Sequence, residues 1–202
     1  MAGTSDQVIQ PMSTDDEIIQ RLVTRIQTPS ARTSRGYCEV FPPASEKITV
    51  AAESELGFAL FPLLRRMYKD VANGGFGPGY GLVGLSRGYR DEEGRSLCAV
   101  YRWKGWADGT LPLWDWGDAT WSCLDIRSPD GTIVTHDAHF GAFDTSFTIH
   151  TWLNAWLQGV NVWNEIFDMD AAPTRTGINP FTKKPLIFRG HGRPKGAPRK
   201  RS

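Results

Sequence analysis

The 202-residue chain lacks any long hydrophobic run and holds only three cysteines. Its apolar runs extend over a few residues, which is too short to span a membrane. Cys38, Cys98 and Cys123 are odd in number and far apart, so they predict neither a disulfide framework nor a zinc signature. The first residues, MAGTSDQVIQPMSTDDE, have no basic start and no apolar core, unlike a signal peptide. We therefore expect a soluble, cytoplasmic protein.

Positive and negative charges are unevenly distributed along the chain. The segment 182–202 holds eight Lys or Arg residues and no acid, which leaves 15 basic and 22 acidic residues over 1–181, a net charge of −7. The pattern predicts a flexible leader over 1–12, one globular domain over 13–181 and a basic tail without a fold over 182–202. The tail could contact nucleic acid or an acidic partner, or contact nothing.

Helical patterns dominate the first part of the chain. A capping box over 14–17 precedes a helix that Pro29 ends. Ser45 can cap a second helix that runs through Leu56, with Gly57 at its end. A third helix begins at Pro62 and carries an apolar stripe as far as Val71. The following Asn73-Gly74-Gly75 favours a left-handed exit from this helix.

The second half of the chain favours strands. Aromatic and β-branched residues predict strands over 111–116, 119–127 and 132–137. The residues 95–103 fit a helix or a strand equally well. A helix capped by Thr145 or Ser146 then carries Phe147, Trp152 and Trp156. Helices, an antiparallel sheet and a final helix predict a single α+β domain.

A glycine-rich stretch over 73–85, NGGFGPGYGLVGL, contains two enzyme-like patterns. GYGLVG at 79–84 matches a dinucleotide-binding loop, and GLSRG at 84–88 matches a nucleophile elbow around Ser86. Both patterns need a strand immediately before the glycines and a helix after them. Here a helix comes before and a loop is expected after. We therefore interpret the stretch as a helix exit, whose glycines allow left-handed backbone.

Other titratable residues give weak signals for catalysis or metal binding. His136, Asp137 and His139 could hold a metal, but their loose spacing is more typical of solvent-facing loop residues. His150 is expected to pack beside Trp152. Glu53 and Glu55 lie two residues apart on a helix, point to different faces and are expected to be solvated. We predict no catalytic, cofactor-binding or metal-binding residue, with an enzyme using Ser86 or His136 and His139 as a remote alternative.

Eight tryptophans are many for a chain of this length. Trp152 and Trp156 lie one helical turn apart and are predicted to be core residues. Alternation along a strand places the side chains of Trp114 and Trp116 on the same face. Core packing is one interpretation of these residues. The other is a partner-binding surface, for which the candidates are Trp103, Trp106, Trp114, Asp115, Trp116 and Asp118.

The segment ESELGFALFPLLRRMYKDVANGGFGPGYGLVGL, residues 53–85, resembles the hallmark of the SUKH superfamily, bacterial relatives of a fungal cell-wall-assembly regulator. LPLWDWGDATWSCLDI and SFTIHTWLNAWLQGV are similar to the later strands and the Trp-bearing helix of that family, and NPFTKKP to the tail of some members. The resemblance covers roughly residues 13–190. Two departures are Phe61, where the family more often has leucine, and the region near Asp118, where it often has cysteine or alanine. The matching hallmark positions are Glu53, Leu56, Gly57, Pro62, Tyr68, Asn73, Gly74 and Gly75.

The resemblance implies an α+β fold and a role as an immunity protein, which binds and neutralises a cognate bacterial toxin domain, often a nuclease. It implies no catalytic residue and no cofactor. The negative charge of residues 1–181 suits a basic partner, because opposite charges speed and orient association. The alternative is a housekeeping interaction or regulatory domain of the same fold without a toxin partner.

Overall fold

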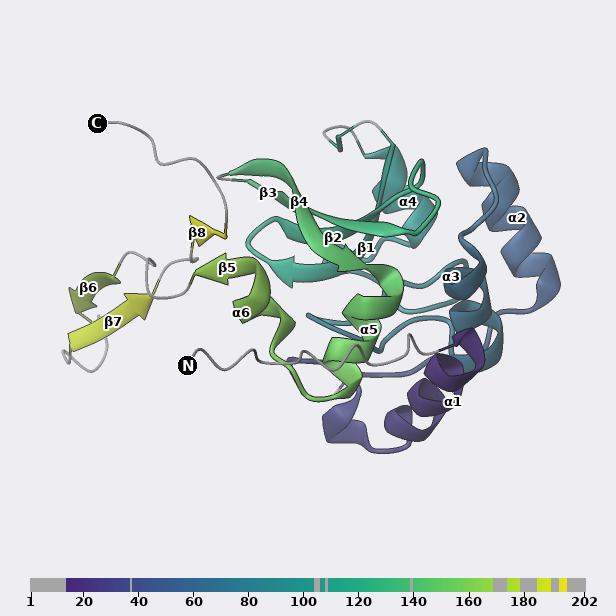
Figure 1. Cartoon of the computed structure of the whole chain (residues 1–202), viewed down its shortest axis with the longest axis horizontal. Coiled ribbons are helices and arrows are strands. Elements are labelled where there is room, and N and C mark those ends of the chain that lie inside the picture. The colour runs from purple at the N-terminus through teal and green to yellow at the C-terminus, as the bar shows by residue number, and fades with distance from the viewer. Residues whose placement is uncertain are drawn as a thin grey trace, which may run out of the picture. The chain divides into compact units, whose positions relative to one another are not determined.

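The computed structural model (Figure 1) describes residues 14–36, 38–103, 106–107, 109–138, 140–168, 174–178, 185–189 and 193–195. The chain divides into two compact units, Met1–Gln158 and Gly159–Ser202. In the first unit, four consecutive strands form an antiparallel sheet in chain order. They are β1 (Thr110–Gly117), β2 (Thr120–Asp125), β3 (Thr132–Asp137) and β4 (Gly141–Thr148). With the helices described below, this sheet confirms the predicted α+β class.

The first two helices begin and end as their sequences predict. In α1 (Asp15–Ile26), the Thr14 hydroxyl accepts a hydrogen bond from the Glu17 amide at 3.3 Å, and the Glu17 carboxylate accepts one from the Thr14 amide at 3.0 Å. This pair is the predicted capping box. In α2 (Glu46–Leu56), Ser45 is the N-cap, and Gly57 ends the helix with a left-handed φ of 84°. A short 3₁₀ turn, η1 (Pro29–Ala31), follows α1.

The third predicted helix changes its winding halfway. It begins as α3 (Pro62–Arg66) and continues as a π-helix, η2 (Met67–Val71), in which the amide of Ala72 donates to the carbonyl of Met67 at 3.1 Å. The predicted apolar stripe is buried along both parts. From η2, the hydroxyl of Tyr68 donates to the carbonyl of Val83 at 2.6 Å. This hydrogen bond links the π-helix to the glycine-rich residues 73–85, which we call the glycine loop.

The glycine loop is held by its own backbone and by Asn73. Gly74 and Gly75 have φ of 90° and 82°, as expected for the helix exit. The side chain of Asn73 accepts from the amide of Leu85 at 2.8 Å and donates to the carbonyl of Ser86 at 3.0 Å. The loop also bonds to the outer edge of β1, because the Tyr80 and Val83 amides each donate to a β1 carbonyl at 2.9 Å.

The segment between β3 and the last helix of the first unit differs from the prediction. Thr145 and Ser146 do not cap a helix; they lie in β4, and Thr148 caps α5 (Ile149–Leu157) by accepting from the Thr151 amide at 3.3 Å. The exposure of β4 side chains alternates along the strand, as a sheet edge with one covered face requires. The ambiguous residues 95–103 contain a helix, α4 (Leu97–Arg102).

The core of the first unit centres on Trp152 of α5. Its ring lies 6.3 Å from that of Trp114, 6.2 Å from that of Trp116 and 5.3 Å from that of Phe147, measured between centroids. Trp152 and Trp156 are both buried, which confirms their prediction as core residues. Helix α5 packs against β3 and β4, and α1 packs against α5 and η2 (Figure 1). No described helix combines the length and apolar character of a membrane span.

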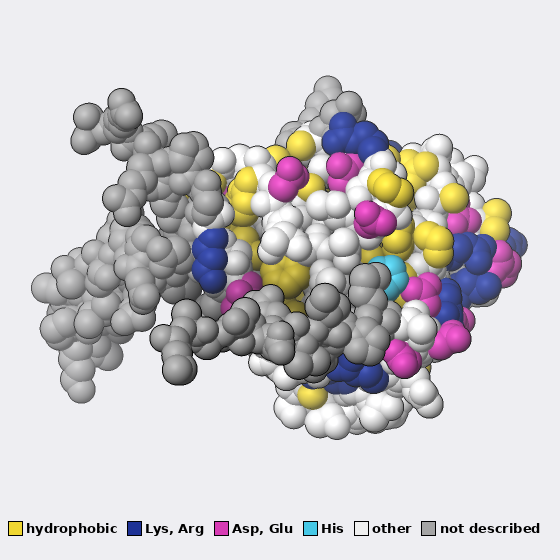
Figure 2. Space-filling view, viewed as in Figure 1, with side chains coloured by type: hydrophobic (Ala, Val, Ile, Leu, Met, Phe, Trp, Pro, Cys, Tyr) yellow, Lys and Arg dark blue, Asp and Glu magenta, His cyan; other side chains and the backbone are white. Residues whose placement is uncertain are grey.

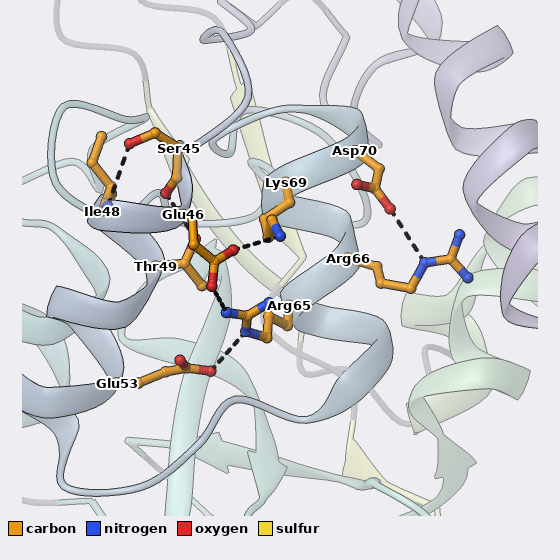
Figure 3. Close-up of polar contacts among 9 residues, drawn as sticks. All are labelled: Ser45, Glu46, Ile48, Thr49, Glu53, Arg65, Arg66, Lys69 and Asp70. Atoms are coloured by element: carbon orange, nitrogen blue, oxygen red, sulfur yellow. Dashed lines mark hydrogen bonds and ion pairs between the residues drawn. The ribbon is translucent and has the colours of Figure 1, made fainter.

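A network of charged side chains joins α2 to α3 and η2 (Figure 3). Glu46 forms ion pairs with Arg65 and Lys69. Glu53 accepts from the Arg65 Nε at 3.1 Å. It also accepts from the amide of Leu60 at 3.1 Å. Glu53 was expected to be solvated, and this is wrong: its side chain is 18% exposed. The turn after α2 brings Leu60 and Arg65 back over it.

The second unit contains short elements. Helix α6 (Val162–Ile166) leads into β5 (Phe167–Asp168), which pairs with β8 (Arg193–Pro194), and β6 (Thr174–Ile178) pairs with β7 (Pro185–Arg189). The predicted boundaries, a leader over 1–12, a domain over 13–181 and a tail over 182–202, stay predictions. Two strands, β7 and β8, nevertheless lie in the range for which no fold was expected, and β7 carries the β-prone sequence LIF.

Replacing Gly75 tests the close approach in the glycine loop. A Cβ at Gly75 would lie 2.0 Å from the carbonyl oxygen of Glu39, whereas a Cβ at Gly57 would meet nothing within 4 Å. Both residues have left-handed φ, so Gly57→Ala measures backbone strain alone, about 1–2 kcal/mol. We expect Gly75→Ala to lower the free energy of unfolding by more than about 3 kcal/mol in urea denaturation. Equal losses for the two variants would contradict the structure.

Replacing Glu53 tests the charge network. Glu53→Ala removes a half-buried hydrogen-bond acceptor from the amide of Leu60 and from Arg65, so we expect a loss of about 1–2 kcal/mol in the free energy of unfolding. Glu55, which pairs with exposed Arg102 at 2.7 Å, serves as the matched control. Glu55→Ala should cost less than about 0.5 kcal/mol. A Glu53 variant as stable as the Glu55 variant would show that the network contributes nothing.

Candidate functional site

A cleft of about 100 Å³ opens between the β1–β2 turn and the loop that precedes α4. Acidic side chains dominate its lining, with one arginine and two tryptophans among them. We call it the acidic cleft. Its lining residues are Asp91, Glu92, Glu93, Arg95, Trp103, Asp115, Gly117, Asp118, Ala119 and Trp121.

The β1–β2 turn places Asp118 at the rim of the cleft. Gly117 pairs with Thr120, so the turn has two central residues, and both Asp118 and Ala119 have positive φ, 49° and 56°. Two-residue hairpin turns of this kind favour Asn-Gly or Asp-Gly, because an alanine in the left-handed region costs about 1–2 kcal/mol. Such local strain is common at functional sites.

Asp115 forms the wall of the cleft. Its side chain is nearly buried, and one carboxylate oxygen accepts a hydrogen bond from the Gly117 amide at 2.8 Å. The glycine loop covers this part of β1, since the amide of Tyr80 donates to the Asp115 carbonyl and a Cβ at Gly79 would lie 2.3 Å from that carbonyl oxygen. Burial raises the pKa of Asp115 from 3.8 to about 6, with the nearby charge of Glu92 adding to the rise.

Arg95 is a cation already held in the acidic cleft. Its guanidinium forms ion pairs with Asp91 at 2.8 Å and with Glu93 at 2.7 Å, and it lies 5.0 Å from the ring centroid of Trp103. The Asp91 carboxylate also accepts from the amide of Arg95 at 2.6 Å, which fixes the loop. The described lining holds five carboxylates and one guanidinium, so acidic groups outnumber basic groups there.

Trp103 stands at the outer end of a row of aromatic rings. Its side chain is 52% exposed, and its ring meets that of Trp106 edge-on at 5.8 Å. Trp106 in turn contacts the rings of Trp121 at 5.5 Å and His136 at 5.2 Å, and its indole N–H donates to the Val100 carbonyl at 2.8 Å. An exposed indole on a fixed support is the arrangement of many interface anchors.

The structure separates the predicted partner-binding candidates into two groups. Asp115, Asp118 and Trp103 line the acidic cleft, and Trp106 supports Trp103. Trp114 and Trp116 share one strand face, as predicted, but that face is covered by α5. As surface anchors they were predicted wrongly, because their exposed fractions are 0% and 4%.

Several cleft residues had not been predicted. Asp91, Glu92, Glu93 and Arg95 lie far from β1 in sequence and reach it only through the fold. Trp121 comes from the next strand. The one available signal was the run DEEGR over 91–95, which is dense in charge and placed between two elements.

The residues considered for hydrolysis or metal binding do not converge. Ser86 lies exposed in a turn that Asn73 holds through the Ser86 carbonyl. The ring of His136 packs against Trp106, and the buried Asp137 accepts from the Thr120 hydroxyl at 2.8 Å. His139 lies outside the described residues. Among the residues that the structure describes, no group of three or more His, Cys, Asp or Glu could hold a metal ion.

His150 has a contact that accounts for it without catalysis. Its Nε2 lies 2.7 Å from a carboxylate oxygen of Asp15, and its ring packs edge-on against Phe61. The side chain therefore links the first turn of α5 to the first turn of α1.

Comparisons with protein-family models and with curated proteins give no match for this chain. The resemblance to the SUKH superfamily therefore rests on the residues quoted for it in the sequence.

The pH dependence of stability tests the burial of Asp115. The folded-state pKa of about 6 lies above the ordinary 3.8, so the folded protein binds the proton more tightly and loses stability as the pH rises from 3.8 to about 6. Asparagine is neutral and its amide oxygen can accept from Gly117. We expect Asp115→Asn to raise the Tm above pH 6 and to have little effect near pH 3.8. Thermal denaturation of both proteins across this range checks it; a difference independent of pH would contradict the burial.

Proposed function

We propose that this protein is a non-catalytic, immunity-type binding protein that acts in the cytoplasm and neutralises a basic toxin domain, which could be a nuclease. The observation that carries the proposal is the exposed indole of Trp103 beside the acidic cleft. The immunity role is inferred from the resemblance to SUKH proteins. The acidic cleft is the surface that we propose binds the partner.

Charge and anchor have separate roles in this proposal. The carboxylates of the cleft attract a basic surface and set its orientation, which raises the association rate. Trp103 buries its exposed ring against the partner, which slows dissociation. Arg95 lies near the ring of Trp103, and a Lys or Arg of the partner can use the same combination of indole face and carboxylate.

The alternative function is a housekeeping or regulatory interaction domain with the same cleft and no toxin partner. A location of the gene immediately downstream of a toxin-domain gene would favour the immunity role. The contact of residues 182–202 with nucleic acid or an acidic partner stays a prediction. Nuclease treatment removes proteins that are captured only through nucleic acid, so it distinguishes a nucleic-acid contact of this segment from partner binding at the cleft.

A pull-down from lysate of the source cells tests the proposed function. Tagged protein is used with and without nuclease, and the captured proteins are identified by mass spectrometry. We expect one near-stoichiometric partner with a basic toxin domain, retained after nuclease treatment. Capture of nucleic-acid-dependent proteins alone, or of a partner that is not a toxin, would contradict the immunity role.

Point variants test the binding face against the captured partner. Trp103→Ala should weaken binding by at least roughly tenfold, because truncation of an anchor costs about 2 kcal/mol or more. Val50→Ala, at a side chain with 51% exposure on α2, is the matched control and should leave the Kd unchanged. Calorimetric titration of each variant gives the Kd. Equal losses for both variants, or none for Trp103→Ala, would place the binding face elsewhere.

A further inference from the structure

A second groove, of about 400 Å³, lies between the last turns of α1 and the end of α5. Its lining residues are Gln20, Arg21, Thr24, Arg25 and Leu157. Four of them come from one face of α1, where residues four apart in sequence lie one above the other. We call it the arginine groove. Figure 2 shows a small patch of Lys and Arg side chains in the lower part of the molecule, near the end of α1.

Both arginines of the groove contact neutral groups. A guanidinium nitrogen of Arg21 donates to the side-chain oxygen of Asn154 at 2.8 Å. Arg25 donates to the carbonyls of Ala31 at 2.9 Å and Leu157 at 3.4 Å, and its guanidinium lies 4.0 Å from the ring centroid of Trp156. Among the residues that the structure describes, no ion pair joins Arg21 or Arg25 to a carboxylate.

Arg32 and Arg35 of the first unit also donate to backbone carbonyls, but other arginines there are paired with acids. Each of five others lies within 4 Å of at least one carboxylate oxygen; they are Arg65, Arg66, Arg95, Arg102 and Arg127. The pKa of Arg25 is lowered by its burial and by the charge of Arg21. Among the described residues, no acid forms an ion pair with either arginine of the groove.

Helix ends offset part of this charge. The C-terminal ends of α1 and α5 each carry about half a negative charge, and Arg25 donates to the last carbonyl of α5. Arg21 and Arg25 also keep guanidinium N–H groups that no contact described above uses, so both charge and donors remain for a ligand.

We propose that the arginine groove binds a phosphate-type oxyanion. A phosphate monoester carries about two negative charges at neutral pH and three acceptor oxygens, which matches two guanidinium groups on one helix face. A carboxylate offers one charge and two oxygens, which is one charge and one acceptor fewer. The inference does not rest on the proposed function, since the two sites lie on different elements and have opposite charge.

Phosphorus NMR of inorganic phosphate tests the groove in the full-length protein at neutral pH and constant ionic strength. We expect the phosphate signal to broaden with wild-type protein, and Arg21→Gln to weaken the affinity roughly tenfold, since it removes a charged hydrogen-bond donor. Arg102→Gln, which removes an exposed ion-paired arginine, is the control and should bind phosphate like the wild type. Arg25→Gln should behave like Arg21→Gln.

Competition identifies the ligand class. Pyrophosphate should displace phosphate, whereas acetate at the same concentration should not. Displacement by acetate would show a carboxylate site and overturn the proposal, as would equal phosphate affinity in the wild type and Arg21→Gln. Because Arg25 also packs on Trp156, its variant could unfold; Arg21, with its single described contact to Asn154, keeps the test decisive.

Discussion

The glycine loop approaches Glu39 and β1 so closely that no side chain fits between the backbones, and the covering of the β1 edge depends on this contact. A Cβ would lie 2.0 Å from the Glu39 carbonyl oxygen at Gly75, and 2.3 Å from that of Asp115 at Gly79. The approach lets the loop donate to β1 carbonyls and so cover a strand edge that would otherwise be open. The loop also contacts the backbone carbonyl of Asp115, whose side chain lines the acidic cleft and whose carboxyl has a pKa that burial raises.

The acidic cleft concentrates features that lower the stability of the fold. Burial opposes the charge of Asp115, and Ala119 lies in the left-handed region, which is unfavourable for an alanine. An apolar side chain at 115 and a glycine at 119 would relieve both costs. Features of this kind are retained where binding benefits from them, because activity and stability often compete at a site. This is the physical reason for proposing a binding face here and not on the well-paired charge network of α2.

Local signals in the sequence predicted much of the fold. The capping box, the helix ends at Gly57 and Asn73, and three of the strands follow from residues that lie close together in the chain. Strand β4 was missed because Thr145 and Ser146 are also good helix caps. The alternating exposure of the side chains over 141–148 fits a strand, and the helix begins only after Thr148. For Trp114 and Trp116, the shared strand face was predicted correctly and the surface exposure was not. Alternation along a strand shows which side chains share a face, but it does not show what covers that face. The cleft brings together residues from 91 to 121, and only the fold shows that proximity.

Photo-crosslinking from position 103 tests most directly whether the acidic cleft is the partner-binding face. A photoreactive phenylalanine analogue replaces Trp103 in one protein and Val50, the exposed control on α2, in another. Both are irradiated in cells that carry the partner, and the adducts are identified by mass spectrometry. The account predicts one covalent adduct with a basic toxin domain from position 103 and none from position 50. Adducts from position 50 alone, or a partner whose crosslinked surface is acidic, would contradict it.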